Sequence, residues 1–458
     1  MEPKTDAGAA LVDALRGLLR KPIGPSVGWL HTLGSLSLAL FLLQVATGVL
    51  LAMVYIPSPD HAHTTVRALM ASSAGRMVRG LHFWGATFMV VAVTLHMLRV
   101  LVLGAYKRPR HWTWAYGVGL LFITLGFGFT GYLLPWDQKA FWATTVGTYM
   151  AGTVPAVGPL LMALIRGAAD VGAATLSRFY ALHTLVFPLL LAGLIAVHLY
   201  LVQVHGIAED EPSDPRLARP FVPDHLAKDA AVTLVAFAAL LVLAALMPPH
   251  LEAVADPLDE TYLPKPEWYF YFYYELLKLF MGPWLIAGTV VLPVLATLVL
   301  LALPLLDRAP VTNPHYRPVA LAIIVAIVAT VAYLTSVTAT STPRPRTFKV
   351  AEGRVTPQVL RGIQVYDRLG CASCHSIQGA GMKSAPDLWR VGARRSSEWI
   401  AQLLQDPQKA LPGTVMFRYR LSEDELQALV AYLASLDLER HRPVEVLPTW
   451  REPKEGTR

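Results

Sequence analysis

The chain has 458 residues, of which 54% are hydrophobic and 16% are charged, and only two are cysteines. Soluble domains usually carry about a quarter charged residues, so this composition indicates a membrane protein. It excludes a disordered chain, a coiled coil and a disulfide-stapled secreted scaffold. The formal net charge of +7 would suit a nucleic-acid partner only if the cations formed one solvated patch. They are scattered between apolar segments, so we expect no nucleic-acid partner.

Seven apolar segments are long enough to cross about 30 Å of hydrocarbon as helices. They are residues 30–56, 80–104, 114–134, 179–203, 230–247, 284–306 and 318–338. We expect no cleavable signal peptide before the first of them, because residues 1–28 are polar and lack an apolar core. The first span itself is then expected to direct export.

The charges between the spans predict an orientation in the inner (cytoplasmic) membrane. The end of the second span and the loop after it carry cations without an acid: Arg99, Lys107, Arg108 and Arg110. The loop after the fifth span carries mainly acids, which are Glu252, Asp256, Asp259, Glu260 and Glu267, against Lys265. Because cytoplasmic loops are rich in Lys and Arg, we expect the amino terminus in the cytoplasm and the carboxyl terminus outside. The acids near 209–214 weaken this argument only slightly, since acids count little in the rule.

The composition changes after the last span. Residues 341–353 are Pro-rich and favour an extended linker, and the residues that follow have ordinary soluble composition. We therefore expect an all-α protein, with a seven-span transmembrane bundle and then a small exported all-α domain. The expected parts are 1–28 (cytoplasmic segment), 29–210 (four spans), 211–340 (three spans), 341–353 (linker), 354–440 (exported domain) and 441–458 (tail).

Two spans carry pairs of histidines. His82 and His96 lie 14 residues apart in the second span, and His183 and His198 lie 15 apart in the fourth. Each separation is close to four helical turns, so each pair shares one face with a rise of about 21–22 Å. Ionisable residues inside a membrane are costly and are candidates for function. Because both spans run inward, we expect His82 opposite His183 near the outer face, and the other two opposite each other near the inner face.

Two imidazoles at each depth favour haem over other interpretations. Zinc normally needs three or four clustered ligands, whereas iron in a planar macrocycle needs two axial ligands. A single span histidine can instead hydrogen-bond a neighbouring helix, but four in matching register favour the metal. We therefore expect two non-covalent b haems, each with two histidine ligands.

Glycines in the neighbouring spans repeat the same interval. Gly34 and Gly48 in the first span, and Gly117 and Gly131 in the third, are each 14 residues apart. Glycine lets a flat haem ring approach the backbone, although it is also a common packing residue in membrane helices. Because the interval coincides with that of the histidines, we expect these glycines to make room for the haems. Arginines at span ends are candidates to pair with haem propionates, the alternative being ordinary snorkelling to the interface; these are Arg79, Arg99 and Arg178.

These segments resemble cytochrome b of the quinol-oxidising cytochrome bc and chloroplast cytochrome bf complexes. The resemblance covers nearly all of residues 25–340, and the motifs that carry it are GSLSLALFLLQVATG, VRGLHFWGA, TGYLLPWDQKAFWA, TLSRFYALH and KPEWYF. The resemblance implies a low-potential haem held by His82 and His183 and a high-potential haem held by the other pair. It also implies propionate contacts for the three arginines, and a subunit IV-like character for residues 211–340.

Two details place the chain nearer the bf branch. One is the 15-residue histidine interval, and the other is the end of the membrane part after seven spans rather than eight. The bf branch also has a cysteine in the first span that tethers an extra haem, whereas Thr32 occupies that position here. We therefore expect no covalent haem at that site, and an extra non-covalent haem stays an open alternative.

Residues 266–269 spell PEWY, in a loop that the topology places outside. Quinol oxidation releases protons outward and needs an acceptor within hydrogen-bond reach of a quinol hydroxyl, a role that suits Glu267. An aromatic loop at a membrane interface is more often an anchoring belt, but the resemblance favours an outer quinol site that includes Tyr269. Tyr132 matches a family position lining that site, and residues 156–167 resemble the short outer helix where the iron–sulfur partner docks.

The inner quinone site is less legible. Lys228 and Asp229 match a Lys-Asp pair that faces quinone in the mitochondrial branch. Gln203 falls where either branch has His or Arg, a departure that puts the chemistry of this site in doubt. His205 lies two residues further on and is the candidate that compensates.

Residues 371–375 spell C-x-x-C-H, the attachment signature of c-type haem. Two thioether bonds need two thiols one helical turn apart, here Cys371 and Cys374, and His375 supplies an axial ligand. A thioredoxin-like motif and half of a zinc site are the alternatives. Neither fits, because the chain has no further cysteine and no strand-rich redox fold is expected around the motif.

The second axial ligand of the c haem is expected from Met416. Its segment, PGTVMF, resembles the methionine loop of small class I cytochromes c, and residues 421–436 resemble their carboxyl-terminal helix. Met382 is the competitor, but it lies only seven residues beyond His375 and is expected to pack locally.

We therefore expect the haem-carrying core subunit of a quinol:cytochrome c oxidoreductase coupled to proton translocation. One quinol electron would pass to a Rieske iron–sulfur protein and on to the c haem, and the other through the two b haems to an inner quinone. Both cysteines are assigned to the c haem and none is left for an iron–sulfur cluster, so the Rieske partner must be another chain. We expect a downstream cytochrome c or oxidase, and the family implies a homodimer.

The runner-up is an electron-relay or anchor subunit of another redox complex, without its own quinol site. The PEWY motif argues against it. A seven-span transporter without redox function leaves C-x-x-C-H unexplained.

Overall fold

The computed structural model describes residues 22–208, 215–257, 262, 265–280, 284–309, 311–341, 348–378, 380–381, 385–412, 414, 416 and 418–446. Several predicted features lie outside these residues, namely most of the expected cytoplasmic segment, the acids at 209–214, Asp259, Glu260, Met382 and most of the expected tail. Within the described residues, seven helical segments are long and apolar enough to cross a membrane. The prediction of an all-α, seven-span protein is confirmed.

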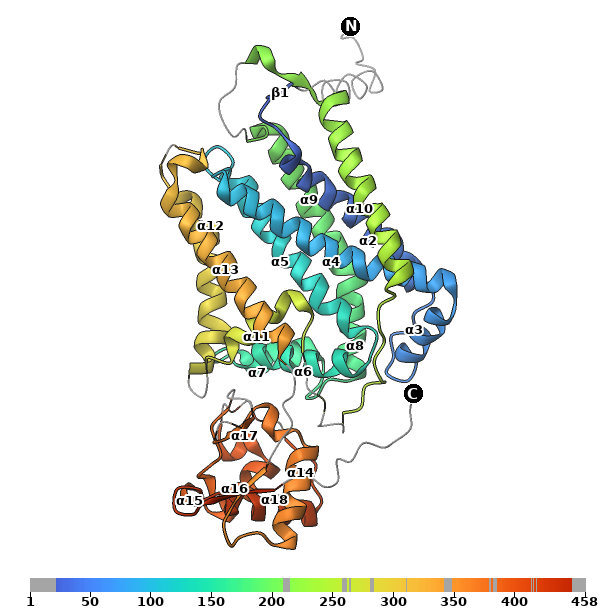
Figure 1. Ribbon diagram of the computed structural model, residues 1–458. Helices are drawn as coiled ribbons and strands as arrows, with labels where there is room; N and C mark the ends of the chain where they lie inside the picture. The colour runs from blue at the N-terminus through green and yellow to red at the C-terminus, as the bar shows by residue number, and fades with distance from the viewer. Residues whose placement is uncertain are drawn as a thin grey trace. The chain divides into compact units, whose positions relative to one another are not determined.

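The spanning helices follow one another along the chain (Figure 1). They are η1 (Trp29–Thr32) with α2 (Leu33–Ala52), α4 (Ser73–Val102), α5 (His111–Leu133), α8 (Ala173–Ala181) with η2 (Leu182–Val186) and α9 (Phe187–His205), η4 (Phe221–His225) with α10 (Leu226–Leu246), η7 (Ala287–Val291) with α12 (Leu292–Leu306), and α13 (Pro318–Thr340). The second span begins seven residues earlier than the apolar pattern indicates. The reason is the cap at Ser72, whose side chain accepts from Gly75 N and starts the helix in a polar stretch.

Shorter elements lie between the spans. The helices are α3 (Ala62–Ala71), α6 (Gln138–Gly152), α7 (Gly158–Arg166) and α11 (Tyr271–Leu277), with 3₁₀ turns at η3 (Pro215–Leu217), η5 (Trp268–Phe270) and η8 (Pro314–Tyr316). Strand β1 (Pro22–Ile23) pairs antiparallel with β2 (Arg219–Pro220). The segment expected to resemble a short outer helix, residues 156–167, contains α7.

The chain divides into two compact units. The first comprises Met1–Trp136, Gly172–Glu252 and Ala296–Thr330. In it α2 and α10 both pack on α4, and α5 packs on α9. Their shared core includes the buried side chains of Leu40, Phe41, Met89, Leu191 and Leu240. These contacts hold α4 and α9, the two histidine-bearing helices, in one bundle.

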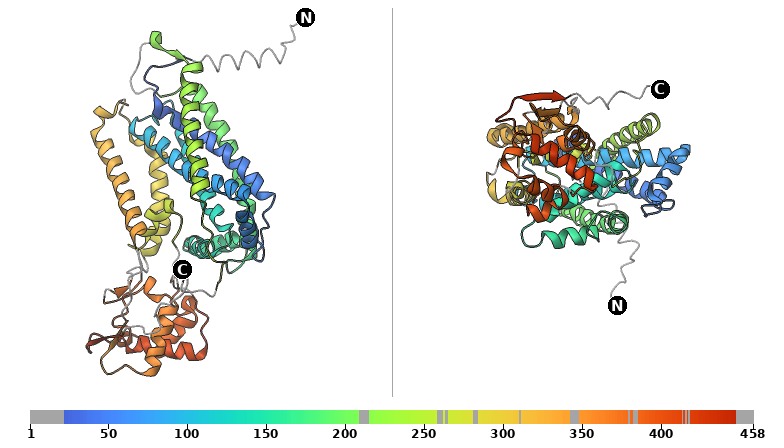
Figure 2. Two further views of the ribbon diagram at one scale, coloured as in Figure 1. Left: turned by 45° about the vertical axis from the view of Figure 1, so that its right-hand side comes forward. Right: turned by 90° about the horizontal axis from the view of Figure 1, so that it is seen from below.

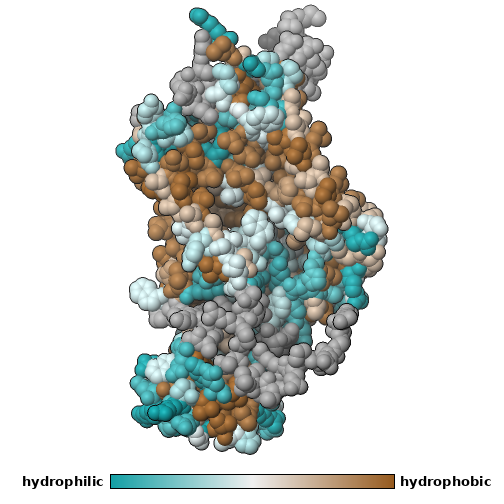
Figure 3. Space-filling view, in the orientation of Figure 1, coloured by the Kyte–Doolittle hydropathy of each residue, from teal (hydrophilic) through white to brown (hydrophobic). Residues whose placement is uncertain are grey.

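The outward surfaces of the spans are apolar. On α13, Val319 is 73% exposed, Ile323 55% and Ile327 58%. Hydrophobic side chains gather over the spans in the space-filling view (Figure 3). Exposed apolar surface of this extent needs a lipid or protein partner, as expected of membrane helices.

A cluster of charges joins the last two spans to the loop between α4 and α5. The Tyr106 hydroxyl donates to Asp307 Oδ2 at 2.5 Å, and Arg317 Nη2 lies 2.7 Å from the same oxygen. Lys107 Nζ lies 3.1 Å from Asp307 Oδ1, and Arg317 Nη1 also donates to the Val102 carbonyl at 2.9 Å. The Arg317 side chain is only 5% exposed, so its charge depends on these partners.

The second unit comprises Asp137–Val171, Ala253–Leu295 and Val331–Arg458. In this unit α6 packs on α7. The unit also includes the carboxyl-terminal domain, which is shown in orange and red (Figure 2). The domain's elements are β3 (Phe348–Ala351), α14 (Pro357–Arg368), η9 (Cys371–Ser373), β4 (Ser376–Ile377), β5 (Ala380–Gly381), α15 (Val391–Arg394), α16 (Ser397–Gln405), α17 (Pro407–Ala410), α18 (Glu423–Ser435) and β6 (Pro443–Val446). Strand β3 lies inside the stretch expected as a linker, and it pairs antiparallel with β6.

Candidate functional site

The four span histidines meet in two pairs within the first unit. The ring centroids of His82 and His183 lie 6.2 Å apart, and those of His96 and His198 lie 6.5 Å apart. Metal–imidazole bonds are about 2 Å long, so each gap leaves room for one metal atom bonded to both facing rings. The pairing has the geometry of two axial ligands, and ligation itself stays a prediction.

A π turn explains the unequal histidine intervals. His183 lies in η2, Leu182–Val186, where the fourth span is π-helical. A π turn bonds residue i to i+5 and so contains one residue more than an α turn. The extra residue turns the 15-residue interval of the fourth span into the equivalent of the 14-residue interval in α4. Both histidines of α4 can therefore face the two histidines of the fourth span at matching depths.

Two threonines fix the proton on the first histidine pair. Thr47 Oγ1 donates to the Leu43 carbonyl at 2.7 Å and lies 2.9 Å from His82 Nδ1. A hydroxyl has a single hydrogen, so the second contact is one in which the imidazole Nδ1–H donates to Thr47. Thr130 repeats the arrangement, with a carbonyl of its own helix at 2.9 Å and His183 Nδ1 at 3.1 Å. The lone pair of each ring is thereby left on Nε2, as a metal ligand requires.

Each of the four repeated glycines lies against one imidazole. The sequence assigns them to the close approach of a haem ring, which stays a prediction, and in the structure each of them also lies beside a histidine ring. From an ideal Cβ placed on each glycine, the distance to Cε1 of the facing ring is 3.4 Å for Gly34 and His96, 3.3 Å for Gly48 and His82, 3.5 Å for Gly117 and His198, and 2.6 Å for Gly131 and His183. A side chain at position 131 would displace the ring that it meets.

The three arginines lie on the same helices as the histidines. Arg79 Nη1 donates to the Pro249 carbonyl at 2.8 Å, and Arg99 Nη2 donates to the Ala208 carbonyl at 3.1 Å. Arg178 lies on α8, five residues before His183. Contact with propionates stays a prediction for all three.

The residues expected at the outer quinol site lie in both units. Tyr132 is on α5, with its ring 5.5 Å from Phe129. Glu267 directly precedes η5, and its Oε1 lies 2.6 Å from Lys139 Nζ on α6. Burial raises the pKa of Tyr269, and the charge of Glu267 raises it further, so this phenol stays protonated. The sequence patterns do not single out Lys139, although it lies inside the motif TGYLLPWDQKAFWA.

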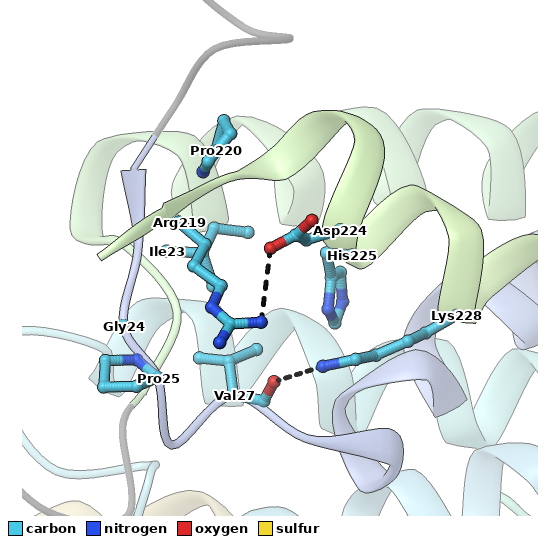
Figure 4. A pocket seen from close by; sticks show the side chains of 9 residues that line it. All are labelled: Ile23, Gly24, Pro25, Val27, Arg219, Pro220, Asp224, His225 and Lys228. Atoms are coloured by element: carbon cyan, nitrogen blue, oxygen red, sulfur yellow. Dashed lines mark hydrogen bonds and ion pairs between the residues drawn. The ribbon is translucent and has the colours of Figure 1, made fainter. Parts of the chain in front are cut away.

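A cavity of about 160 Å³ lies where β1, β2 and the start of the α10 span meet (Figure 4). Lys228 lines it and donates from Nζ to the Val27 carbonyl at 3.3 Å. His225, one turn earlier on the same helix, also lines it, and the sequence patterns do not point to this residue. The complete lining is Ile23, Gly24, Pro25, Val27, Arg219, Pro220, Asp224, His225 and Lys228.

Two residues expected at the inner site are not part of this lining. Asp229 is buried and accepts a hydrogen bond from Ser35 Oγ at 2.6 Å. His205 ends α9, with Nδ1 3.5 Å from Thr113 Oγ1. The structure therefore brings Lys228 to the cavity and places Asp229 and His205 outside its lining.

The C-x-x-C-H motif forms a tight turn at η9. Cys371 and Cys374 carry free thiols, and the Cys374 amide donates to the Cys371 carbonyl at 3.2 Å. His375 Nδ1 lies 2.8 Å from the Pro386 carbonyl, which has no hydrogen, so the ring donates. Burial lowers the pKa of His375. The imidazole is therefore neutral and its Nε2 is left for a metal.

The remainder of the carboxyl-terminal domain also suits a haem. Met416 packs against the domain's hydrophobic core, as Cys371 and Trp389 also do. The rings of Tyr366 and Tyr432 contact each other edge to face at 5.2 Å. Among the described residues no hydrogen-bond partner reaches the buried Tyr432 hydroxyl, so a polar edge of a bound group is free to satisfy it. Met382, the alternative to Met416 as the second axial ligand, lies outside the described residues.

Three family models match the chain. Cytochrome b/b6/petB matches residues 18–206, the carboxyl-terminal cytochrome b/b6/petD model matches residues 254–354, and cytochrome c matches residues 359–437. The boundaries of the third match enclose the C-x-x-C-H turn and Met416.

Individual relatives agree with these models. The cytochrome bc complex cytochrome b subunit of Chlorobaculum thiosulfatiphilum is 37% identical over 283 residues, which are 60% of this chain and 65% of that one. The chain thus spans about two thirds of that relative's length. Cytochrome b6 of Prochlorothrix hollandica is 43% identical over 189 residues, 41% of this chain and 85% of the relative. A solved structure of a hyperthermophilic respiratory Complex III superposes with a TM-score of 0.67 at 28% identity, covering 74% of this chain and 90% of that one.

Proposed function

Because the chain belongs to the cytochrome b/b6 family and carries a cytochrome c domain at its carboxyl end, we propose that it is the haem-carrying core subunit of a quinol:cytochrome c oxidoreductase. The family role is electron transfer through haem b and haem c in a membrane-bound complex. The proposal adds the substrate, the number of haems and the route of the electrons.

Three haems are assigned to residues of this chain. His82 with His183 and His96 with His198 would each hold a non-covalent haem b. Cys371 and Cys374 would bind a haem c covalently, with His375 and Met416 as its axial ligands. When bound, each haem supplies an iron that accepts and releases one electron. The protein contributes ligand orientation, through Thr47, Thr130 and the Pro386 carbonyl.

Quinol would be oxidised beside Glu267, which accepts a hydroxyl proton. One electron would leave to a Rieske iron–sulfur protein supplied by another chain, and from there reach the carboxyl-terminal domain and a downstream cytochrome c or oxidase. The other would cross the membrane by way of the two histidine pairs to an inner quinone near Lys228. We place the complex in the inner membrane as a homodimer, with the carboxyl-terminal domain outside.

The two facing histidine pairs carry this proposal. Their centroid separations of 6.2 and 6.5 Å occur in one bundle, four turns apart, which suits two redox centres stacked across a membrane. The runner-up, an electron relay without its own quinol site, also needs such centres. Glu267 favours quinol oxidation over the relay, because a carboxylate in a PEWY loop supplies the proton acceptor that a relay does not need.

The test is purification of the complex from membranes with its partner subunits. Haem staining and pyridine spectra count the haems, and quinol-to-cytochrome c turnover measures activity. Glu267→Gln is expected to slow turnover about 10²-fold, the scale of a lost general base, while both b haems remain. Unchanged turnover in that variant would refute the proton-acceptor role. A complex with three haems and no quinol oxidation would establish the relay instead.

A further inference from the structure

The carboxylate proposed to accept the quinol proton is already held by a cation. Glu267 Oε1 lies 2.6 Å from Lys139 Nζ, a charge-assisted hydrogen bond. The two side chains are 15% and 30% exposed, so the pair is screened from bulk water on most sides. Both residues belong to the second unit, although 128 positions separate them in the sequence.

The position of Lys139 in its helix is unfavourable for the helix itself. Helix α6, Gln138–Gly152, is capped by Asp137, whose side chain accepts from Ala140 N at 2.9 Å. Lys139 is the second residue after that cap. The amino-terminal end of a helix favours negative charge and disfavours positive charge. Helix stability therefore does not account for this lysine, whereas its ion pair with Glu267 does.

The same turn of α6 anchors the loop that leads to the PEWY motif. Gln138 N donates to the Ala253 carbonyl at 3.0 Å, and Asp256 N donates to Gln138 Oε1 at 3.2 Å. Asp137 and Val254 form an antiparallel bridge beside these bonds. Lys139 thus meets Glu267 in a junction that several backbone contacts support.

We propose that Lys139 is a positioning residue for quinol oxidation: its ammonium holds Glu267 as an oriented carboxylate through Oε1 and leaves Oε2 to accept the quinol proton. This inference rests on the proposed function. In the step, a quinol O–H bond breaks and an Oε2–H bond forms, while Lys139 keeps its own proton.

Lys139→Met removes the charge and keeps the length of the side chain. We expect the kcat of quinol oxidation to fall about ten-fold, which corresponds to the loss of one charge-assisted hydrogen bond, with KM changing less than two-fold. Lys139→Arg keeps the charge and is expected to restore most of the rate. Lys278→Met is the matched control, because it breaks another short ion pair of the second unit, with Glu275 at 2.7 Å.

A double-mutant cycle separates positioning from folding. If Lys139 acts only through Glu267, then Lys139→Met in the Glu267→Gln background causes no further loss of rate. Losses that multiply would overturn the proposal, as would full turnover in Lys139→Met alone. Should Lys139→Met lose b haem, Lys139→Gln is measured instead, and a wild-type rate there overturns the proposal.

These outcomes stay distinct from those that test the proposed function. A wild-type complex that does not oxidise quinol refutes the function itself. A wild-type complex that oxidises quinol and a Lys139→Met variant that matches it refute only the role of the lysine.

Discussion

At the scale of single residues, the hydroxyl of Thr47 determines which nitrogen of His82 is available. The hydroxyl donates its hydrogen to the carbonyl four residues earlier, so the imidazole must donate to the hydroxyl oxygen. A histidine ligand that donates its other N–H is more basic than one that does not. A basic ligand stabilises the oxidised metal, so the hydroxyl is expected to keep low the reduction potential of the haem that we propose at His82.

Thr47→Val removes the acceptor and keeps the shape of the side chain. We expect the reduction potential of one b haem to rise while that of the other stays unchanged, as measured by redox titration of the b-band absorbance. Thr124→Val is the control, because Thr124 is buried and, among the described residues, its hydroxyl donates to the carbonyl four residues earlier, Leu120 at 2.8 Å, and not to a histidine. Equal shifts in both haems, or none, would contradict the assignment.

At the scale of elements, the bundle depends on how closely helices carrying glycine approach helices carrying histidine. The four approaches are unequal. An added Cβ at Gly117 would lie 3.5 Å from His198, an ordinary contact, whereas at Gly131 it would lie 2.6 Å from His183. The tighter approach occurs where the fourth span is π-helical, in η2. The same substitution should therefore have opposite outcomes on one helix, α5.

Gly131→Ala is expected to displace the His183 ring and to lose one b haem, because packed interiors tolerate little added volume. Gly117→Ala is expected to keep both haems. The measurement is the ratio of b haem to c haem in the purified protein, since the c haem lies in another part of the chain. Loss of haem in Gly117→Ala, or two b haems in Gly131→Ala, would show that the described contacts do not limit the site.

At the scale of the whole molecule, the sequence predicts the long apolar spans better than it predicts the short helices and the contacts between distant side chains. The seven spans follow from apolar length and are confirmed, because only hydrophobic segments of that length satisfy a bilayer. The short helices α3 and α6 are not found by a search for apolar spans, since neither is long or apolar enough to cross a membrane. The junction of Lys139 with Glu267 also leaves no periodic signal, because it joins side chains that are far apart in the sequence.

Local helix geometry decides which of the residues expected at the inner site line the cavity. A Lys-Asp pair in sequence suggests one shared site, yet adjacent residues of a helix point in different directions. Lys228 accordingly lines the cavity while Asp229 bonds Ser35. His225 shares the face of Lys228 because it lies three residues earlier, and a helical-face argument from Lys228 would have found it.

The charge cluster around Asp307 ties the last two spans to the loop between α4 and α5. Burial opposes ionisation of this carboxyl, but hydrogen bonds from Tyr106 and Lys107 outweigh burial, and its pKa lies below the ordinary value of 3.8. A carboxyl whose pKa is lowered in the folded state adds stability above its unfolded pKa and loses that contribution as the pH falls through the folded value.

Asp307→Asn is therefore expected to cost about 1.5–3 kcal/mol at pH 7, the scale of a hydrogen bond to a charged group. The temperature at which the purified protein loses its b-haem absorbance should fall by a few degrees. The difference from wild type should shrink below about pH 4, where Asp307 begins to protonate in the unfolded chain. Asp224→Asn, in an exposed pair 3.6 Å from Arg219, should change little at either pH. A difference that persists at low pH would assign the loss to packing rather than to charge.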